Sequence, residues 1–199
     1  NGTFVDGQPC TSTVVGHGAV VRCGDSLLVF EIGPRLAGDW DEQDTIESAL
    51  LEREVDRVAR TDAPVLFLGP TGAGKGYVAQ RAAERASRTG PYVHVNCAAL
   101  PSELVESELF GHERGAFTGA NASKAGLIEE ADGGTLFLDE IGTLAPPLQA
   151  KLLTAVEEGQ IRRVGATRGR KVDVRYMSAT NVDIDAAIEA GEFREDLYF

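Results

Sequence analysis

The sequence predicts an α/β fold in which a parallel sheet lies between two layers of helices, preceded by a fragment of an all-β sandwich. Two observations predict it. Apolar runs of strand length occur in "APVLFLGP", "YVHVN", "TLFLDE" and "VRYMSAT", and they alternate with segments whose apolar residues recur at helical spacing. Continuously apolar strands are buried on both faces, as in parallel sheets covered by helices. The first 32 residues instead alternate short β-type runs with turn signals such as Asp6-Gly7.

Three parts follow from this change of pattern. Residues 1–32 form a β-rich piece, residues 33–43 carry Gly, Pro and acidic residues and are predicted to be a linker, and residues 44–199 form the α/β domain. The chain opens without an initiator methionine or a signal peptide and is expected to be a fragment of a longer protein.

The helices of the α/β domain can be placed in order. Asp44 and Glu47 form a capping box before the first of them. The helix "GYVAQRAAERASR" is expected to end at Gly90, and the helix "SELVESELF" follows the second strand. Pro146-Pro147 can begin a helix that stops at Gly159.

The last elements are predicted from turn and capping residues. "IRRV" and "KVDV" flank the Gly- and Arg-containing "GATRGR" and are expected to pair as a hairpin. Asp183 is expected to cap a short final helix that Gly191 closes.

Composition excludes several classes of protein. The hydrophobic content of 43% and charged content of 25% are those of a soluble globular protein, and no window of about 18 apolar residues predicts a membrane span. The net charge of −12 argues against nucleic-acid binding by this piece, because phosphate neutralisation needs a basic surface. Cys10, Cys23 and Cys97 lack zinc-ligand spacing and are expected to be reduced thiols, with a catalytic cysteine as the weaker alternative.

The segment "GPTGAGKG" matches the pattern of a P-loop and lies between a predicted strand and a predicted helix, the context that this motif requires. Gly72 and Gly74 allow backbone N–H groups to surround phosphate oxygens, and Lys75 adds a positive charge at the β and γ phosphates. Gly76 stands where Ser or Thr usually binds Mg²⁺. A glycine-rich turn that merely joins strand to helix is the alternative. The predicted nucleotide-binding residues are Gly69, Pro70, Thr71, Gly72, Ala73, Gly74, Lys75 and Gly76.

Acidic and amide side chains follow two further strands at the edge where ligands bind in such sheets. Asp139 and Glu140 end "TLFLDE". Asp139 is expected to hold Mg²⁺ through water, and Glu140 is expected to orient and deprotonate the attacking water. Thr180 and Asn181 end "VRYMSAT" and could contact the γ phosphate or that water. Acids that only solvate a strand end, and an ordinary helix-capping Thr-Asn pair, are the alternatives.

These motifs, together with "VNCAAL", "ESELFGHERGAFTGA", "LQAKLLTAVEEGQIRRVG" and "FREDLYF" in the same order, resemble those of bacterial enhancer-binding proteins, the AAA+ activators of sigma-54 RNA polymerase. The resemblance covers about residues 44–199. It implies a P-loop AAA+ fold, an ATPase that uses ATP and Mg²⁺, a cytoplasmic bacterial protein, and a ring, expected to be a hexamer.

The resemblance gives roles to further residues. The segment Gly115, Ala116, Phe117, Thr118, Gly119 and Ala120 resembles the loop that contacts sigma-54, with Phe117 as its apolar anchor; a Phe buried in a tight turn is the alternative. Asn96 resembles the switch asparagine that holds Glu140, and Thr180 with Asn181 resembles sensor I. The "GATRGR" hairpin resembles the second surface loop of the family. Arg194 resembles an arginine finger that acts on ATP in the neighbouring subunit, with an ordinary surface arginine as the alternative.

The sequence also departs from the family pattern. Pro70 and Gly76 replace the usual glutamates of the P-loop region, and the family fold includes a further strand, a helical lid and, in many members, a DNA-binding domain beyond residue 199. Contact with DNA is therefore expected only through such a C-terminal domain.

The first 32 residues resemble a different family. "NGTFVDG" and "VVRCGDSLLVFEI" resemble the C-terminal part of a forkhead-associated (FHA) domain, which binds phosphothreonine peptides. Asn1 matches an asparagine that shapes the peptide site. An FHA part implies regulation by Ser/Thr phosphorylation.

Three functions remain open on the sequence. The first is an ATP-driven activator that remodels sigma-54 holoenzyme. The second is a phosphopeptide-binding module whose ATPase is secondary or inactive, and the third is an AAA+ remodeller with a different client. An intact Glu140 and Phe117 count against the second, and the 115–120 segment counts against the third.

Overall fold

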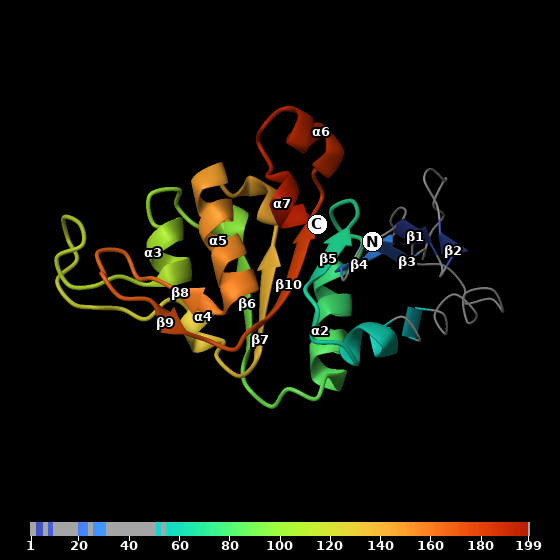
Figure 1. Ribbon diagram of the computed structural model, residues 1–199, viewed down its shortest axis with the longest axis horizontal. Helices are drawn as coiled ribbons and strands as arrows, with labels where there is room; N and C mark the ends of the chain where they lie inside the picture. The colour runs from blue at the N-terminus through green and yellow to red at the C-terminus, as the bar shows by residue number, and fades with distance from the viewer. Residues whose placement is uncertain are drawn as a thin grey trace.

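The computed structural model describes residues 3–5, 8–9, 20–23, 26–30, 51–52 and 55–198. Its main feature is an eight-stranded sheet in the order β2-β1-β3-β4-β5-β10-β7-β6, and β8 and β9 form a separate pair (Figure 1). The strands are β1 Thr3–Val5, β2 Gln8–Pro9, β3 Val20–Cys23, β4 Ser26–Phe30, β5 Val65–Leu68, β6 Tyr92–Asn96, β7 Thr135–Asp139, β8 Gln160–Ile161, β9 Arg170–Lys171 and β10 Arg175–Thr180.

The four predicted apolar strands are β5, β6, β7 and β10, and their parallel pairing confirms the predicted fold class. The register places Thr180 beside Leu68 and Asn96 beside Asp139. The carboxyl ends of these strands therefore lie along one edge of the sheet, as Figure 1 lets the reader follow.

Helices cover both faces of this sheet. They are α2 Lys75–Arg85, α3 Val105–Phe110, α4 Leu127–Glu130, α5 Pro146–Glu158, α6 Ile184–Glu189 and α7 Glu195–Tyr198, with 3₁₀ helices η1 Cys97–Ala99 and η2 Ile141–Thr143. Residues 55–59 are also helical and pack with α2 in the same core cluster.

Alternation along β7 divides the core into two layers. Phe137 packs with the cluster that includes residues 55–59 and α2, whereas Leu136 and Leu138 pack with the cluster that includes α3, α4, α5 and α6. Because successive strand residues point to opposite faces, a strand apolar at every position requires cover on both sides. The three-layer arrangement follows from that requirement.

Several expected helix ends are confirmed. Gly159 takes a left-handed conformation with φ of 59° directly after α5. Asp183 caps α6 by accepting a hydrogen bond from Ala186 N, and Gly191 follows that helix with φ of 72°.

The predicted end of α2 at Gly90 is wrong. The helix ends at Arg85, after which Ala86 is extended, and Arg88 is held by ion pairs to Asp62 and Asp173. Glycine is required at position 90 for a different reason, because a Cβ there would lie 2.3 Å from the carbonyl carbon of Gly133. It is a glycine because two backbone segments cross at that point.

The first four strands lie on the far side of β5. β4 runs parallel to β5, with Phe30 beside Leu68, and β3, β1 and β2 continue the sheet in antiparallel order. The sequence predicts that these residues belong to a separate all-β sandwich, whereas in the structure strands β1 to β4 extend the central sheet. Without β4, strand β5 would be the edge of the parallel sheet, with unpaired N–H and C=O groups that a further strand can satisfy. The assignment of residues 1–32 to an FHA domain stays a prediction, and Asn1, Asp6-Gly7, the linker 33–43 and the Asp44–Glu47 capping box lie outside the described residues.

The predicted hairpin after α5 is present in a shorter form. β8 and β9 pair antiparallel over two residues each, around the loop that contains "GATRGR". Within the described part of the chain, no helix has both the length and the apolar character needed to cross a membrane.

Candidate functional site

The P-loop connects the carboxyl end of β5 to the first turn of α2. Gly72 and Gly74 have φ of 85° and 83°, and a Cβ at either position would meet nothing within 4 Å. Conformation, not packing, therefore requires glycine at these two positions. Gly69 N donates to the carbonyl oxygen of Thr180, which fixes the start of the loop to the neighbouring strand β10.

Lys75 is the first residue of α2 and is largely buried at the centre of this loop. Its Nζ donates to the carbonyl oxygens of Gly69 at 2.9 Å and Pro70 at 3.1 Å. The loop thus surrounds an ammonium group at the positive end of a helix, where an anion is favoured by both charge and dipole. A Cβ on Gly76, the next residue, would have only an ordinary contact, 3.7 Å from Phe137.

Asp139 and Glu140 end β7, and Glu140 has an unusual backbone. Its φ of 55° and ψ of 46° lie in the left-handed region, and among the described residues it is the single non-glycine with positive φ. Asp139 Oδ1 accepts the Glu140 N–H at 3.0 Å, and the Glu140 carbonyl accepts from both the N–H and the hydroxyl of Thr143. Backbone of this kind is strained by about 1–2 kcal/mol and persists only where surrounding contacts hold it, typically at functional sites.

Asn181 connects the P-loop with Glu140. Its Nδ2 donates to Thr71 Oγ1 at 2.8 Å, and its backbone N–H donates to Glu140 Oε2 at 3.2 Å. Residues that follow β5, β7 and β10 are thereby joined in one chain of hydrogen bonds, in which Asn181 uses both its side chain and its backbone N–H.

Thr180 and Asn96 lie at the same edge but make other contacts. The Thr180 side chain is fully buried and its Oγ1 accepts the Val182 N–H, so its link to the P-loop is through its carbonyl group alone. Asn96 Oδ1 accepts the Ala98 N–H at 2.9 Å and caps η1. Within the described residues, the hydrogen bond to the Glu140 side chain comes from Asn181 and not from Asn96.

Arg194 lies between α6 and α7, and its side chain is 42% exposed. Its Nε donates to Asp196 Oδ1 at 2.9 Å. Among the residues that the structure describes, the Arg194 side chain pairs with Asp196, and its role as an arginine finger stays a prediction.

The first surface loop (residues 111–126) carries the 115–120 segment. The turn is closed by hydrogen bonds from Gly115 N to Ala120 O and from Ala120 N to Phe117 O. Phe117 is 38% exposed, and its ring meets the edge of His112 with centroids 5.0 Å apart. Phe117 is therefore neither a core residue nor fully free of contacts.

The base of this loop is fastened to the second surface loop (residues 162–169). Glu113 N donates to Val164 O and Val164 N donates to Gly111 O, and Figure 1 shows the two loops side by side beyond α4.

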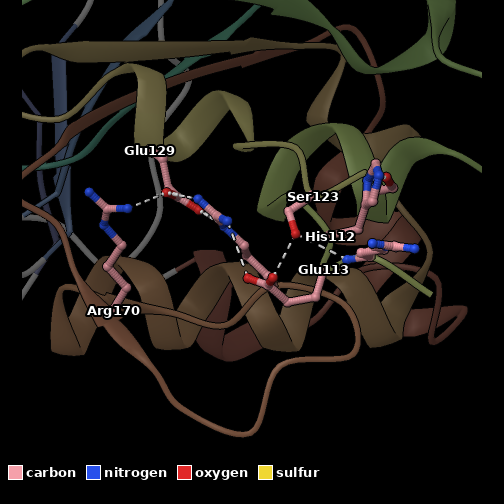
Figure 2. Close-up of polar contacts among 8 residues, drawn as sticks. His112, Glu113, Ser123, Glu129 and Arg170 are labelled. Carbon is pink, nitrogen blue, oxygen red and sulfur yellow. Dashed lines mark hydrogen bonds and ion pairs between the residues drawn. The ribbon is translucent and has the colours of Figure 1, made fainter. Parts of the chain in front are cut away.

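Charged and polar side chains reinforce that base, as Figure 2 shows for Glu113, Ser123, Glu129 and Arg170. The Glu129 side chain is 6% exposed and pairs with Arg163 Nε at 2.6 Å and Arg170 Nη1 at 2.8 Å. Arg163 also contacts Glu113 at 3.2 Å. The hydrogen bonds from Arg163 hold the pKa of Glu129 below its usual range. Sequence reasoning missed this network, because members in contact are separated by up to 50 residues and share no local pattern.

The remaining reactive groups offer little chemistry. Burial, followed by the nearby charge of Asp139, raises the pKa of the Cys97 thiol to about 12, so this cysteine is not a nucleophile. Among residues the structure describes, no group of three or more His, Cys, Asp or Glu side chains could hold a metal ion by itself. A cation at Asp139 would need further oxygen ligands, which phosphate groups and water can supply.

Comparison with known proteins identifies relatives of the chain. The family model described as the sigma-54 interaction domain matches residues 42–199. A Nif-specific regulatory protein of Rhodobacter capsulatus is 53% identical over 147 residues, which is 73% of this chain and 25% of the relative. The sigma-54-dependent transcriptional activator SfnR of Pseudomonas putida is 51% identical over 158 residues, 79% of this chain and 43% of the relative.

A solved structure agrees with these matches. NtrX from Brucella abortus in complex with ADP is 39% identical and superposes with a TM-score of 0.71, covering 82% of this chain and 34% of that one. The chain thus spans between a quarter and somewhat under half the length of these relatives.

Proposed function

Because the chain belongs to the family of sigma-54 interaction domains, we propose that it binds and hydrolyses ATP in order to remodel sigma-54 RNA polymerase holoenzyme for promoter opening. The observation that carries the proposal is the chain of hydrogen bonds Thr71–Asn181–Glu140. It joins the P-loop to the carboxylate of a glutamate whose backbone is strained.

The P-loop fits a nucleotide triphosphate. Gly72 and Gly74 leave open space where Cβ atoms would lie, and Lys75 can exchange its two carbonyl partners for phosphate oxygens. Asp139 is the residue that would hold Mg²⁺, whose charge would neutralise the β and γ phosphates when it is bound. NtrX, a relative of similar structure, has been solved with ADP and with ATP.

Glu140 is proposed as the base that orients and deprotonates the attacking water. The hydrogen bond from Asn181 N fixes one of its carboxylate oxygens and leaves the other to accept the water proton. Arg194 of an adjacent subunit is proposed to stabilise charge on the transferred phosphoryl group, an effect worth roughly 10³–10⁵ in rate where it has been measured. A ring, expected to be a hexamer, would bring each Arg194 to a neighbouring site, and Asn96 would sense the state of the nucleotide.

The 115–120 segment is proposed to contact sigma-54. The exposed face of Phe117 supplies an apolar anchor at the end of a loop whose base is fixed by Glu113 and Val164. A rigid base and a small, glycine-flanked end suit a part that transmits motion to a transient partner. The protein would act in the bacterial cytoplasm, with residues 1–32 binding a phosphothreonine peptide if they belong to an FHA domain, and with DNA contacted through a C-terminal domain.

Two variants of the full-length protein test the proposal. Glu140→Gln should abolish ATP hydrolysis, and wild-type hydrolysis should rise more than linearly with protein concentration if active sites are shared between subunits. Phe117→Ala should keep ATP hydrolysis within about two-fold of wild type and abolish open-complex formation by sigma-54 polymerase, because a hot-spot aromatic carries much of a transient contact.

Leu104→Ala is the matched control, since Leu104 is an apolar side chain of similar exposure, 41%, outside the two surface loops. It should keep both activities. Hydrolysis without any loss of polymerase activation in Phe117→Ala would favour a different client, and no hydrolysis by wild type at any concentration would favour an inactive ATPase beside a phosphopeptide module.

A further inference from the structure

A buried glutamine joins two segments that the proposed function uses separately. Gln149 lies in the first turn of α5 and is fully buried, although it is a polar residue on a helix with one exposed face. Its Nε2 donates to Leu144 O at 2.7 Å and Glu192 O at 2.8 Å, and its Oε1 accepts the Arg194 N–H at 2.8 Å.

The three partners fix the orientation of the amide. Two carbonyl groups require a donor and one N–H requires an acceptor, so the rotated amide would face like groups at all three contacts. Each partner is a backbone group that would lose its hydrogen bond if Gln149 were replaced by an apolar residue. The Gln149 amide therefore satisfies the hydrogen bonds of three backbone groups, at Leu144, Glu192 and Arg194.

The first segment follows the proposed catalytic base. Glu140 is tied to Thr143 by two hydrogen bonds, and Leu144 closes η2 directly after it. The second segment carries the proposed arginine finger. Phe193 is buried in the core between Glu192 and Arg194, while the Arg194 side chain is 42% exposed and pairs with Asp196.

From these contacts we infer that Gln149 is the positioning residue for the Arg194 finger, and that it fixes the finger backbone against the segment that follows Glu140. This inference rests on the proposed function, in which Arg194 acts on nucleotide held by an adjacent subunit. Gln149 contacts only the backbone of Arg194 among these groups, so the Arg194 side chain can exchange Asp196 for a phosphoryl group. The contact holds in place the backbone that carries this side chain.

The test uses Gln149→Met in the full-length protein, a substitution that keeps the length of the side chain and removes all three hydrogen bonds. ATP affinity should stay within about two-fold of wild type, because the nucleotide is bound by Lys75 of the same subunit. The kcat for ATP should fall by about 10–10²-fold, as expected when a group that stabilises the transition state is displaced by about an ångström.

Mixed rings separate this effect from a loss of folding. Gln149→Met subunits are expected to keep the nucleotide site, and Lys75→Ala subunits are expected to keep the finger. Mixing the two impaired proteins should therefore raise hydrolysis at the interfaces they share. Arg194→Ala mixed with Lys75→Ala should be restored in the same way. Glu140→Ala mixed with Lys75→Ala should stay inactive, because both changes damage the site that binds nucleotide.

An unchanged kcat in Gln149→Met would overturn the inference. So would a low kcat that Lys75→Ala does not restore while it restores Arg194→Ala. If Gln149→Met does not fold, Gln149→Asn, which keeps the amide but shortens its reach by one methylene group, goes through the same mixing, and its failure to be restored counts equally against the inference. Absence of hydrolysis by wild type would instead remove the proposed function itself.

Discussion

The P-loop and the first surface loop are both glycine-rich, but their glycines have different physical roles. At Gly72 and Gly74 a Cβ would meet nothing within 4 Å, and the positive φ alone requires glycine; the same holds for Gly115 at the end of the surface loop. At the base of that loop, a Cβ on Gly126 would lie 2.3 Å from Gly111 N. At the end of the surface loop, glycine is required because of the backbone conformation. At the base of the loop, glycine is required because backbone segments pack closely, and ion pairs hold the same region.

The largest effect is expected at the base. Gly126→Ala should lower the free energy of unfolding by about 3 kcal/mol, because the added methyl group overlaps backbone atoms of 109–111 that cannot move independently. Denaturant unfolding of the purified protein measures it. Gly191→Ala is the control: its φ is 72° with open space around it, so it should cost only about 1 kcal/mol. Equal losses in the two variants would show that packing does not distinguish the base.

The next effect concerns the ion pairs of the base. Arg163→Met should cost about 2 kcal/mol, since it removes one of the two arginines that pair with the buried Glu129 carboxylate. The same unfolding measurement applies. Arg162→Met, at the exposed neighbouring arginine, should change stability by less than about 0.5 kcal/mol. A loss in Arg162→Met as large as in Arg163→Met would mean that net charge, and not this pair, stabilises the loop.

A smaller, pH-dependent effect is expected at Glu129. Its pKa is lowered in the folded protein, mainly by hydrogen bonds from Arg163, so its stabilising contribution is present above the unfolded pKa of about 4.3 and is lost as pH falls through the lower folded value. Glu129→Gln should therefore cost about 1.5 kcal/mol at neutral pH. The difference from wild type should shrink as unfolding is measured at successively lower pH below about 4. A difference that stays constant with pH would contradict this origin.

The smallest effect is a gain in the P-loop region. Gly76→Ala should raise the free energy of unfolding by about 0.5–1 kcal/mol, because Gly76 lies within α2 and its Cβ would make only an ordinary contact with Phe137. Gly74→Ala, two residues away, should instead lose about 1 kcal/mol because of its positive φ. A loss of stability in both variants would contradict the prediction for Gly76→Ala and would show that α2 has no room for a Cβ at this position.

Local patterns predicted much of the fold. The strands β5, β6, β7 and β10 follow from apolar runs bounded by turn residues, and the P-loop follows from its glycines between a strand and a helix. The ends of α5 and α6 follow from Gly159 and Asp183.

What the sequence did not predict depends on partners distant in the chain. Gly90 has the local pattern of a helix cap, and nothing near it in the sequence indicates the crossing with Gly133. Gln149 has the spacing of an ordinary helical residue, and its partner Arg194 lies 45 residues away. The connection of Glu140 to Asn181 depends on two strands being neighbours in the sheet, which follows from topology and not from either motif.

The backbone of Glu140 has a consequence for any attempt to engineer this protein. Glu140 is the one non-glycine residue with positive φ among the residues that the structure describes. Glycine or asparagine would adopt this left-handed conformation with less strain. Selection for heat resistance alone would therefore favour replacing the residue on which the proposed hydrolysis depends. A screen that scores thermal tolerance without scoring turnover would enrich durable, inactive variants at position 140, so the two traits have to be selected together.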